Sequence, residues 1–129
     1  MSATITDEQL AARELVRSWA AGSGAYAAVR DVESGATQAW RPVYRGLADL
    51  GLFGVAVAEE AGGAGGSVRD LCAMVEEAAR ALVPGPVATT ALATLVVTDP
   101  AVLESLTTGR SAGAALTADL RADSARVSG

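Results

Sequence analysis

Residues 67–86, SVRDLCAMVEEAARALVPGP, contain the strongest helix pattern in the sequence and limit its fold most tightly. Ser67 is a good N-cap, and Asp70 follows at the third helical position, as in a capping box. The VPGP stretch, residues 83–86, ends the helix firmly. Seven apolar residues recur at helical spacing between these signals and predict one continuous buried stripe: Val68, Leu71, Cys72, Val75, Ala78, Ala79 and Leu82.

The acidic residues of this helix belong to its predicted polar side. Glu76 and Arg80 stand four positions apart in the order that favours a weak ion pair. Glu77 is expected to be solvated beside Glu76, and the adjacent Glu59 and Glu60 are expected to be a solvated surface pair. None of these carboxylates has the spacing of a matched acid and base.

Further helix patterns occur on both sides of this segment. Residues 7–21 follow a capping-box pattern of Thr6 and Gln9, and Leu15 and Trp19 share one helical face. Residues 26–32 fit either a short helix or an ordered loop. The remaining helices are predicted from Trp40 to Gly51, over residues 87–97, where the β-branched residues also suit a strand, and from Pro100 to Gly109.

Residues 52–66, LFGVAVAEEAGGAGG, raise the question of a phosphate-binding loop. We predict extended chain over residues 52–57, followed by an exposed glycine-rich loop. A Walker loop needs a lysine, and the sequence has none. The dinucleotide fingerprint needs a third glycine where Val68 stands. The loop is therefore interpreted as a flexible connection between helices.

These patterns define an all-α fold, an orthogonal or up-down bundle of about five to six helices, with a short C-terminal β segment at residues 112–120. Half of the residues are hydrophobic but only five are aromatic, so the core is built largely from Ala, Val and Leu. Trp19 and Trp40 are expected to be core anchors, and Cys72 a buried small hydrophobe.

The composition excludes several classes of function. With no histidine, the chain has no Ser-His-Asp triad and no histidine metal site, and with no lysine it forms no Schiff base. A net charge of −5 without a basic cluster argues against nucleic acid or an anionic membrane as a partner. No apolar run is long enough to span a bilayer. We therefore predict no catalytic residue, no metal site and a cytoplasmic location.

Residues 40–93 contain an ordered series of motifs: the LADLG stretch at 47–51, Glu59-Glu60, the GGAG stretch at 62–65, Glu76-Glu77 and the VPGP stretch at 83–86. In this order they resemble the N-terminal helical domain of acyl-CoA dehydrogenases. The chain departs from the family pattern at Ala58, where the family has proline, at Ala61, where it has an aromatic residue, and at Arg110, where it commonly has glutamate.

The resemblance implies a three-domain flavoenzyme of which this chain is the beginning. Residues 1–110 would be the N-terminal helical domain, which walls one side of the acyl pocket, and residues 111–129 the start of a middle β domain. FAD would lie between that domain and a C-terminal bundle, whose glutamate removes the proton α to the thioester while a hydride passes to the flavin. By the same resemblance, Leu116 and Thr117 match flavin-contacting positions of the first strand.

Two hypotheses follow for function. In the first, the chain is part of an FAD-dependent acyl-CoA dehydrogenase that is inactive alone, does not bind FAD tightly by itself, and completes a homo- or hetero-oligomer through missing domains. In the second, it is a non-catalytic helical interaction module or accessory subunit that docks on a partner. The coding sequence beyond Gly129 distinguishes them.

Overall fold

The computed structural model describes residues 4–113, which form six α-helices and two short 3-10 helices. In chain order these are α1 (Asp7–Ala21), α2 (Ala25–Glu33), α3 (Trp40–Asp49), η1 (Leu52–Gly54), η2 (Glu59–Ala61), α4 (Val68–Arg80), α5 (Val87–Val96) and α6 (Pro100–Thr107). No strand occurs within residues 4–113, and the predicted all-α fold is confirmed. The predicted β segment falls almost entirely outside the described residues.

The helix starts are fixed by the caps that the sequence indicates. The Thr6 hydroxyl accepts a hydrogen bond from the Gln9 N–H at 3.1 Å and begins α1. At α4, the Asp70 N–H donates to Ser67 Oγ at 3.1 Å and the Ser67 N–H donates to Asp70 Oδ2 at 3.0 Å. Both halves of the predicted capping box are therefore present.

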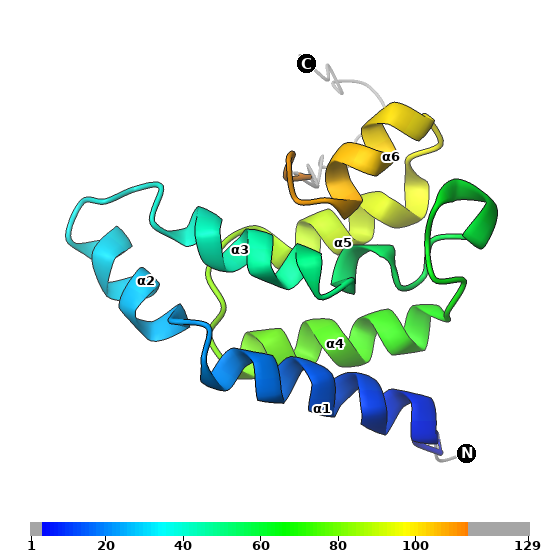
Figure 1. Cartoon of the computed structure of the whole chain (residues 1–129), viewed down its shortest axis with the longest axis horizontal. Coiled ribbons are helices and arrows are strands. Elements are labelled where there is room, and N and C mark those ends of the chain that lie inside the picture. The colour runs from blue at the N-terminus through cyan, green and yellow to red at the C-terminus, as the bar shows by residue number, and fades with distance from the viewer. Residues whose placement is uncertain (1–3, 114–129) are drawn as a thin grey trace, which may run out of the picture.

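Helix α4 lies in the middle of the bundle. Figure 1 shows α1 lying along one side of α4, with α3 and α5 on the other side. Helix α2 packs on α3 at one end, and α6 packs on α5. Residues 26–32, for which both a helix and a loop remained open, lie in α2.

The first residues of the connection between α3 and α4 lie at the centre of the core, and the predicted extended conformation of residues 52–57 is wrong. Leu52 and Phe53 lie in the 3-10 helix η1, and neither side chain is exposed to solvent. Gly51 has φ +98°, a left-handed conformation that reverses the chain between α3 and η1. As a result η1 contacts α3, α4, α5 and α6.

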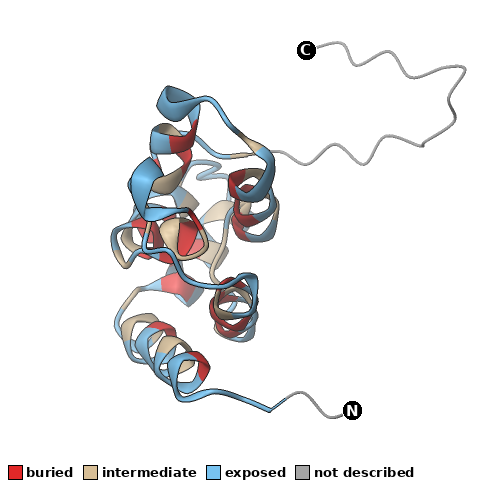
Figure 2. Ribbon diagram, turned by 90° about the vertical axis from the view of Figure 1, so that its right-hand side faces the viewer, coloured by how far each residue is buried: buried red, intermediate tan, exposed pale blue. Residues whose placement is uncertain are grey.

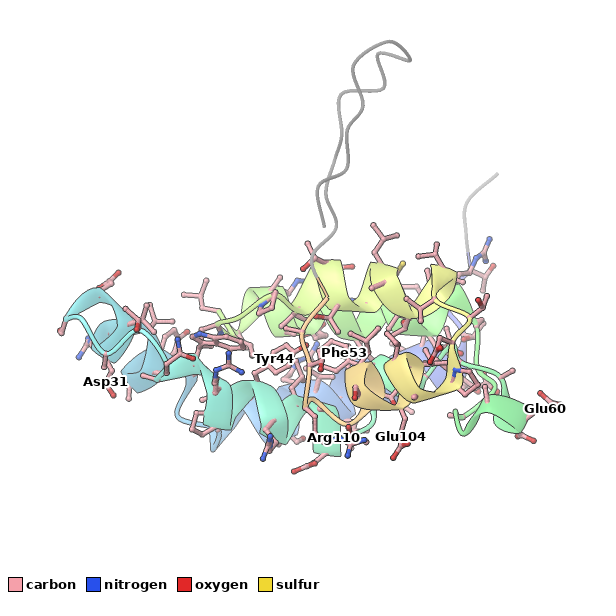
Figure 3. The ribbon with its side chains drawn as sticks, turned by 90° about the horizontal axis from the view of Figure 1, so that it is seen from above. Asp31, Tyr44, Phe53, Glu60, Glu104 and Arg110 are labelled. Carbon is pink, nitrogen blue, oxygen red and sulfur yellow. The ribbon has the colours of Figure 1, made fainter. Side chains whose placement is uncertain are left out.

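Three aromatic rings pack together beside η1. Tyr44 meets Trp40 edge to face with 5.3 Å between ring centroids, and its ring lies 5.1 Å from that of Phe53. Figure 3 shows Tyr44 and Phe53 in the interior between the helices. Trp19 and Trp40 are only partly buried, and both pack against the core. The aromatic residue at the centre of the core is therefore Phe53.

The buried face of α4 differs from the predicted stripe. Its buried residues are Leu71, Ala73, Met74, Glu77 and Ala78. Cys72 is exposed, so its prediction as a buried hydrophobe is wrong, and Val68 and Leu82 are exposed as well. The reason is that α1 covers the Glu77 side of α4, which the sequence assigned to solvent. The buried face of α1 also differs from the predicted one, because Val16 is buried and Leu15 is exposed.

The glycine-rich loop is folded upon itself by backbone hydrogen bonds. The N–H groups of residues 63–66 donate to the carbonyls of Ala58, Gly54, Val57 and Val55 in turn, at 2.7–3.0 Å. A phosphate cradle needs free N–H groups that point at the anion. These four are already used within the loop, which agrees with its interpretation as a connection, although it is more compact than a flexible linker.

Candidate functional site

A shallow apolar groove runs between α4 and α5 and is the strongest candidate site within residues 4–113. Its volume is about 330 Å³. Residues from both helices line it: Leu71, Cys72, Val75, Glu76, Ala88, Ala91, Leu92 and Leu95. Glu76 is the one charged residue of that lining. The groove offers packing surface and almost no polar recognition, so it suits an apolar occupant.

Helix α5 explains why the groove exists. Its sequence, VATTALATLV, carries no charged residue, and a helix without a polar face is normally buried all round. Here only one side of α5 is buried, and the buried residues on it are Val87, Thr90, Ala91 and Thr94. On the other side Leu92 is 51% exposed and Val96 is 71% exposed. Figure 2 shows the exposed positions in pale blue and the buried ones in red, facing the interior.

The sequence did not reveal this surface because its α4 residues were assigned to the core. Cys72 and Val75 fit a buried helical stripe as well as they fit an exposed groove. The available signal was the absence of any charged residue over residues 87–97.

A second hollow, between α1, α2 and α4, borders the main charged cluster of the described residues. Glu77 is only 4% exposed, and its Oε1 accepts hydrogen bonds from Arg17 at 3.1 Å, Arg80 at 3.1 Å and Arg13 at 3.5 Å. The predicted solvated position of Glu77 is therefore wrong. The predicted Glu76–Arg80 ion pair is present, at 2.6 Å, and Glu76 also pairs with Arg13.

This cluster holds α1 on α4 and is unsuited to proton transfer. Burial alone would raise the pKa of the Glu77 carboxyl, but hydrogen bonds and charges from Arg17, Arg80 and Arg13 outweigh burial and lower the pKa. A carboxylate with a lowered pKa and three arginine donors is a poor base at neutral pH. Its role is to stabilise the α1–α4 contact.

Replacing Glu77 with glutamine is expected to reduce both stability and its dependence on pH. Because the folded-state pKa of Glu77 is lowered, its ionised form adds stability above the ordinary value of about 4.5, and that stability is lost as pH falls through the folded pKa. At pH 7 the variant should lose about 1–3 kcal/mol of unfolding free energy, since charge-assisted bonds are weakened. Urea unfolding at pH 7 and pH 3 measures both effects.

Glu60→Gln is the matched control, because Glu60 is exposed and points away from the molecule in Figure 3. Between pH 7 and pH 3, Glu60→Gln should lose as much unfolding free energy as the parent chain does. If Glu77→Gln and Glu60→Gln lose equal stability between pH 7 and pH 3, the role given to the arginine-bound carboxylate is wrong.

Every buried side-chain nitrogen and oxygen within residues 4–113 has a hydrogen-bond partner. The predicted flavin contacts, Leu116 and Thr117, lie outside the described residues. Glu59 and Glu60 are both exposed, as expected of a surface pair.

Residues 4–113 lack two further features, a cluster of metal ligands and a helix that could span a membrane. These residues contain no group of three or more potential metal ligands among aspartate, glutamate and cysteine. None of the helices in this part of the chain is both long and apolar enough to cross a membrane.

An all-α domain with a glycine-rich connection between two of its helices agrees with what the family resemblance implies. Residues 6–107 match the family described as "Acyl-CoA dehydrogenase, N-terminal domain". The chain therefore belongs to the acyl-CoA dehydrogenase family, whose members are generally FAD-dependent oxidoreductases of acyl-CoA substrates.

One relative shows how this chain compares with a longer protein. The chain is 63% identical over 132 residues to acyl-CoA dehydrogenase FadE34 of Mycobacterium tuberculosis. The match covers 95% of this chain but only 19% of the relative. No solved structure matches the chain.

Proposed function

We propose that this chain is the N-terminal helical part of a flavin-dependent acyl-CoA dehydrogenase, which removes hydrogens from the α and β carbons of an acyl-CoA thioester. The α4–α5 groove would be the wall that it contributes to the acyl pocket. The observation that carries this proposal is the uncharged α5 helix, whose Leu92, Leu95 and Val96 are exposed in a domain that matches this family.

The groove suits a hydrocarbon chain for a physical reason. Moving each CH₂ group from water onto an apolar surface gains about 0.8 kcal/mol. Leu92 and Leu95 of α5 and Val75 of α4 provide such a surface. When bound, FAD would accept the hydride, and by the family resemblance the base that removes the α proton would be a glutamate of the C-terminal bundle. Residues 1–110 would form the helical domain and residues 111–129 the start of the next one.

Replacing Leu92 with aspartate in the full-length protein is expected to lower kcat/KM for acyl-CoA at least tenfold. A charge next to the acyl chain must be desolvated, which costs more than the about 1.4 kcal/mol that corresponds to a tenfold effect. Steady-state oxidation of acyl-CoA with an artificial electron acceptor measures the effect.

Leu10→Asp is the matched control, since Leu10 of α1 is 53% exposed and Leu92 is 51% exposed. The control should change kcat/KM less than threefold, because Leu10 lies outside the groove lining. Equal effects of the two substitutions would contradict the assignment of the groove to the acyl pocket.

The alternative, a non-catalytic helical module or accessory subunit, uses the same groove to dock a protein partner. Sequencing the reading frame beyond codon 129 separates the two functions. A β-domain pattern followed by a helical bundle supports the dehydrogenase, and a stop codon directly after Gly129 contradicts it. We place the protein in the cytoplasm on this proposal.

A further inference from the structure

The last described residues are held against α5 by two threonine side chains. After α6 the chain returns to the first half of α5, where the Gly113 N–H donates to Thr90 Oγ1 at 3.0 Å. Thr89 Oγ1 donates to the Gly113 carbonyl oxygen at 2.8 Å. The N–H group and the carbonyl oxygen of Gly113 are therefore both hydrogen-bonded to neighbouring side chains of α5.

This attachment continues into the core through Tyr44. The Tyr44 hydroxyl donates to the same Thr90 Oγ1 at 2.8 Å, and Thr90 is completely buried. Burial raises the pKa of Tyr44 and the bond to Thr90 partly opposes that rise, so the phenol stays a donor at neutral pH. Tyr44 in turn packs against Phe53. A chain of contacts thus connects the centre of the core to Gly113.

Only glycine fits at the end of this connection. A Cβ built on Gly113 would lie 2.7 Å from the Ala93 Cβ and 3.2 Å from the Thr90 Cα, which are closer than carbon atoms normally approach. The backbone at Gly113 is therefore in direct contact with the surface of α5. We propose that Tyr44, Thr89 and Thr90 are positioning residues that fix the point at which the chain leaves this domain.

The position of this exit has a consequence for the next segment. Leu116 follows Gly113 by three residues, and three residues of extended chain span at most about 11 Å. Any residue three positions after Gly113 is therefore limited to that reach from the anchored Gly113. On the proposed function, the anchored Gly113 would limit how far the predicted flavin-contact residues can stand from the helix that walls the acyl pocket.

Amide hydrogen exchange at Gly113 tests the attachment without any assumption about function. Thr89→Val and Thr90→Val each remove one hydroxyl and should speed exchange at Gly113 about five- to tenfold, which corresponds to one lost hydrogen bond. Thr98→Val removes a hydroxyl between α5 and α6, away from Gly113, and should leave the exchange rate unchanged. Equal exchange in all three variants would overturn the proposal.

A distance measurement separates positioning from stability. Cys72 is the only cysteine of the chain and is exposed, so a spin label there can be paired with one at Ala112→Cys, which is also exposed. The parent chain should give a narrow distance distribution, which broadens in Thr89→Val while Tm stays unchanged. Thr89 is only half-buried, so this variant is expected to fold even if Thr90→Val does not.

The two proposals fail separately. A distribution that is equally broad before and after Thr89→Val would refute the fixed exit and leave the dehydrogenase assignment standing. A stop codon after Gly129 would remove the dehydrogenase assignment, while slow exchange at Gly113 would still establish the exit.

Discussion

Phe53→Ala is expected to cost about 3–5 kcal/mol of unfolding free energy. Phe53 has the largest fully buried side chain within residues 4–113, and it lies in η1, which contacts four helices. Removing the Phe53 ring leaves a cavity between η1 and the helices that pack around it. A domain of this size normally has only about 5–15 kcal/mol of stability. Urea unfolding followed by circular dichroism measures the loss.

Tyr26→Ala is the control for aromatic truncation, because Tyr26 is 65% exposed on α2. That substitution should change the unfolding free energy by less than about 0.5 kcal/mol. A loss from Phe53→Ala no larger than that from Tyr26→Ala would show that η1 is not the centre of the core.

Gly63→Ala is expected to cost about 2–4 kcal/mol, because the new methyl group would collide with backbone atoms. A Cβ at Gly63 would lie 2.2 Å from the Val57 carbonyl oxygen and 2.5 Å from the Val57 Cβ. That carbonyl also accepts the hydrogen bond from the Gly65 N–H. The loop must open to relieve the collision, and opening breaks backbone hydrogen bonds between residues 63–66 and residues 54–58. Thermal unfolding of the variant measures the loss.

Gly54→Ala provides the comparison within the same segment. A Cβ there meets no atom within 4 Å, and its φ is not in the left-handed region. This variant should be neutral or gain a few tenths of a kcal/mol, since alanine restricts the unfolded chain. Equal stability of the two alanine variants would contradict the close packing of the loop.

Signals that are local in the sequence predicted the helices well. The caps at Thr6 and at Ser67 with Asp70 act within one helical turn, so they are readable without knowledge of the rest of the fold. The glycine-rich loop was also recognised as a connection, because the residues that phosphate binding needs are missing. These features depend on neighbours three or four positions away.

Features that depend on distant contacts were predicted poorly. Leu52 and Phe53 looked like extended chain because Gly51 and Gly54 flank a run too short for an α-helix. Glu77 looked solvated because its partners Arg13 and Arg17 are 60 or more positions away in the sequence. The buried side of α4 is chosen by α1, and its own apolar spacing does not reveal that choice.

The candidate site was only partly foreseen. The resemblance indicated a wall of an acyl pocket but named no residue of α5 for it. The residues it did name, Leu116 and Thr117, lie outside the described residues and stay predictions. The groove became recognisable once the structure showed Leu92 and Val96 exposed on a helix without charge.

The way α1 is attached has a consequence for how the domain comes apart. Helix α1 packs mainly on α4, and that contact includes the side chains of Arg13 and Arg17 around the Glu77 carboxylate. Helix α1 also contributes Val16, which is fully buried in the same apolar cluster as Tyr44 and Phe53. Detachment of α1 would therefore break the arginine–carboxylate bonds and also uncover part of that cluster, so higher ionic strength weakens only the charged part of its attachment.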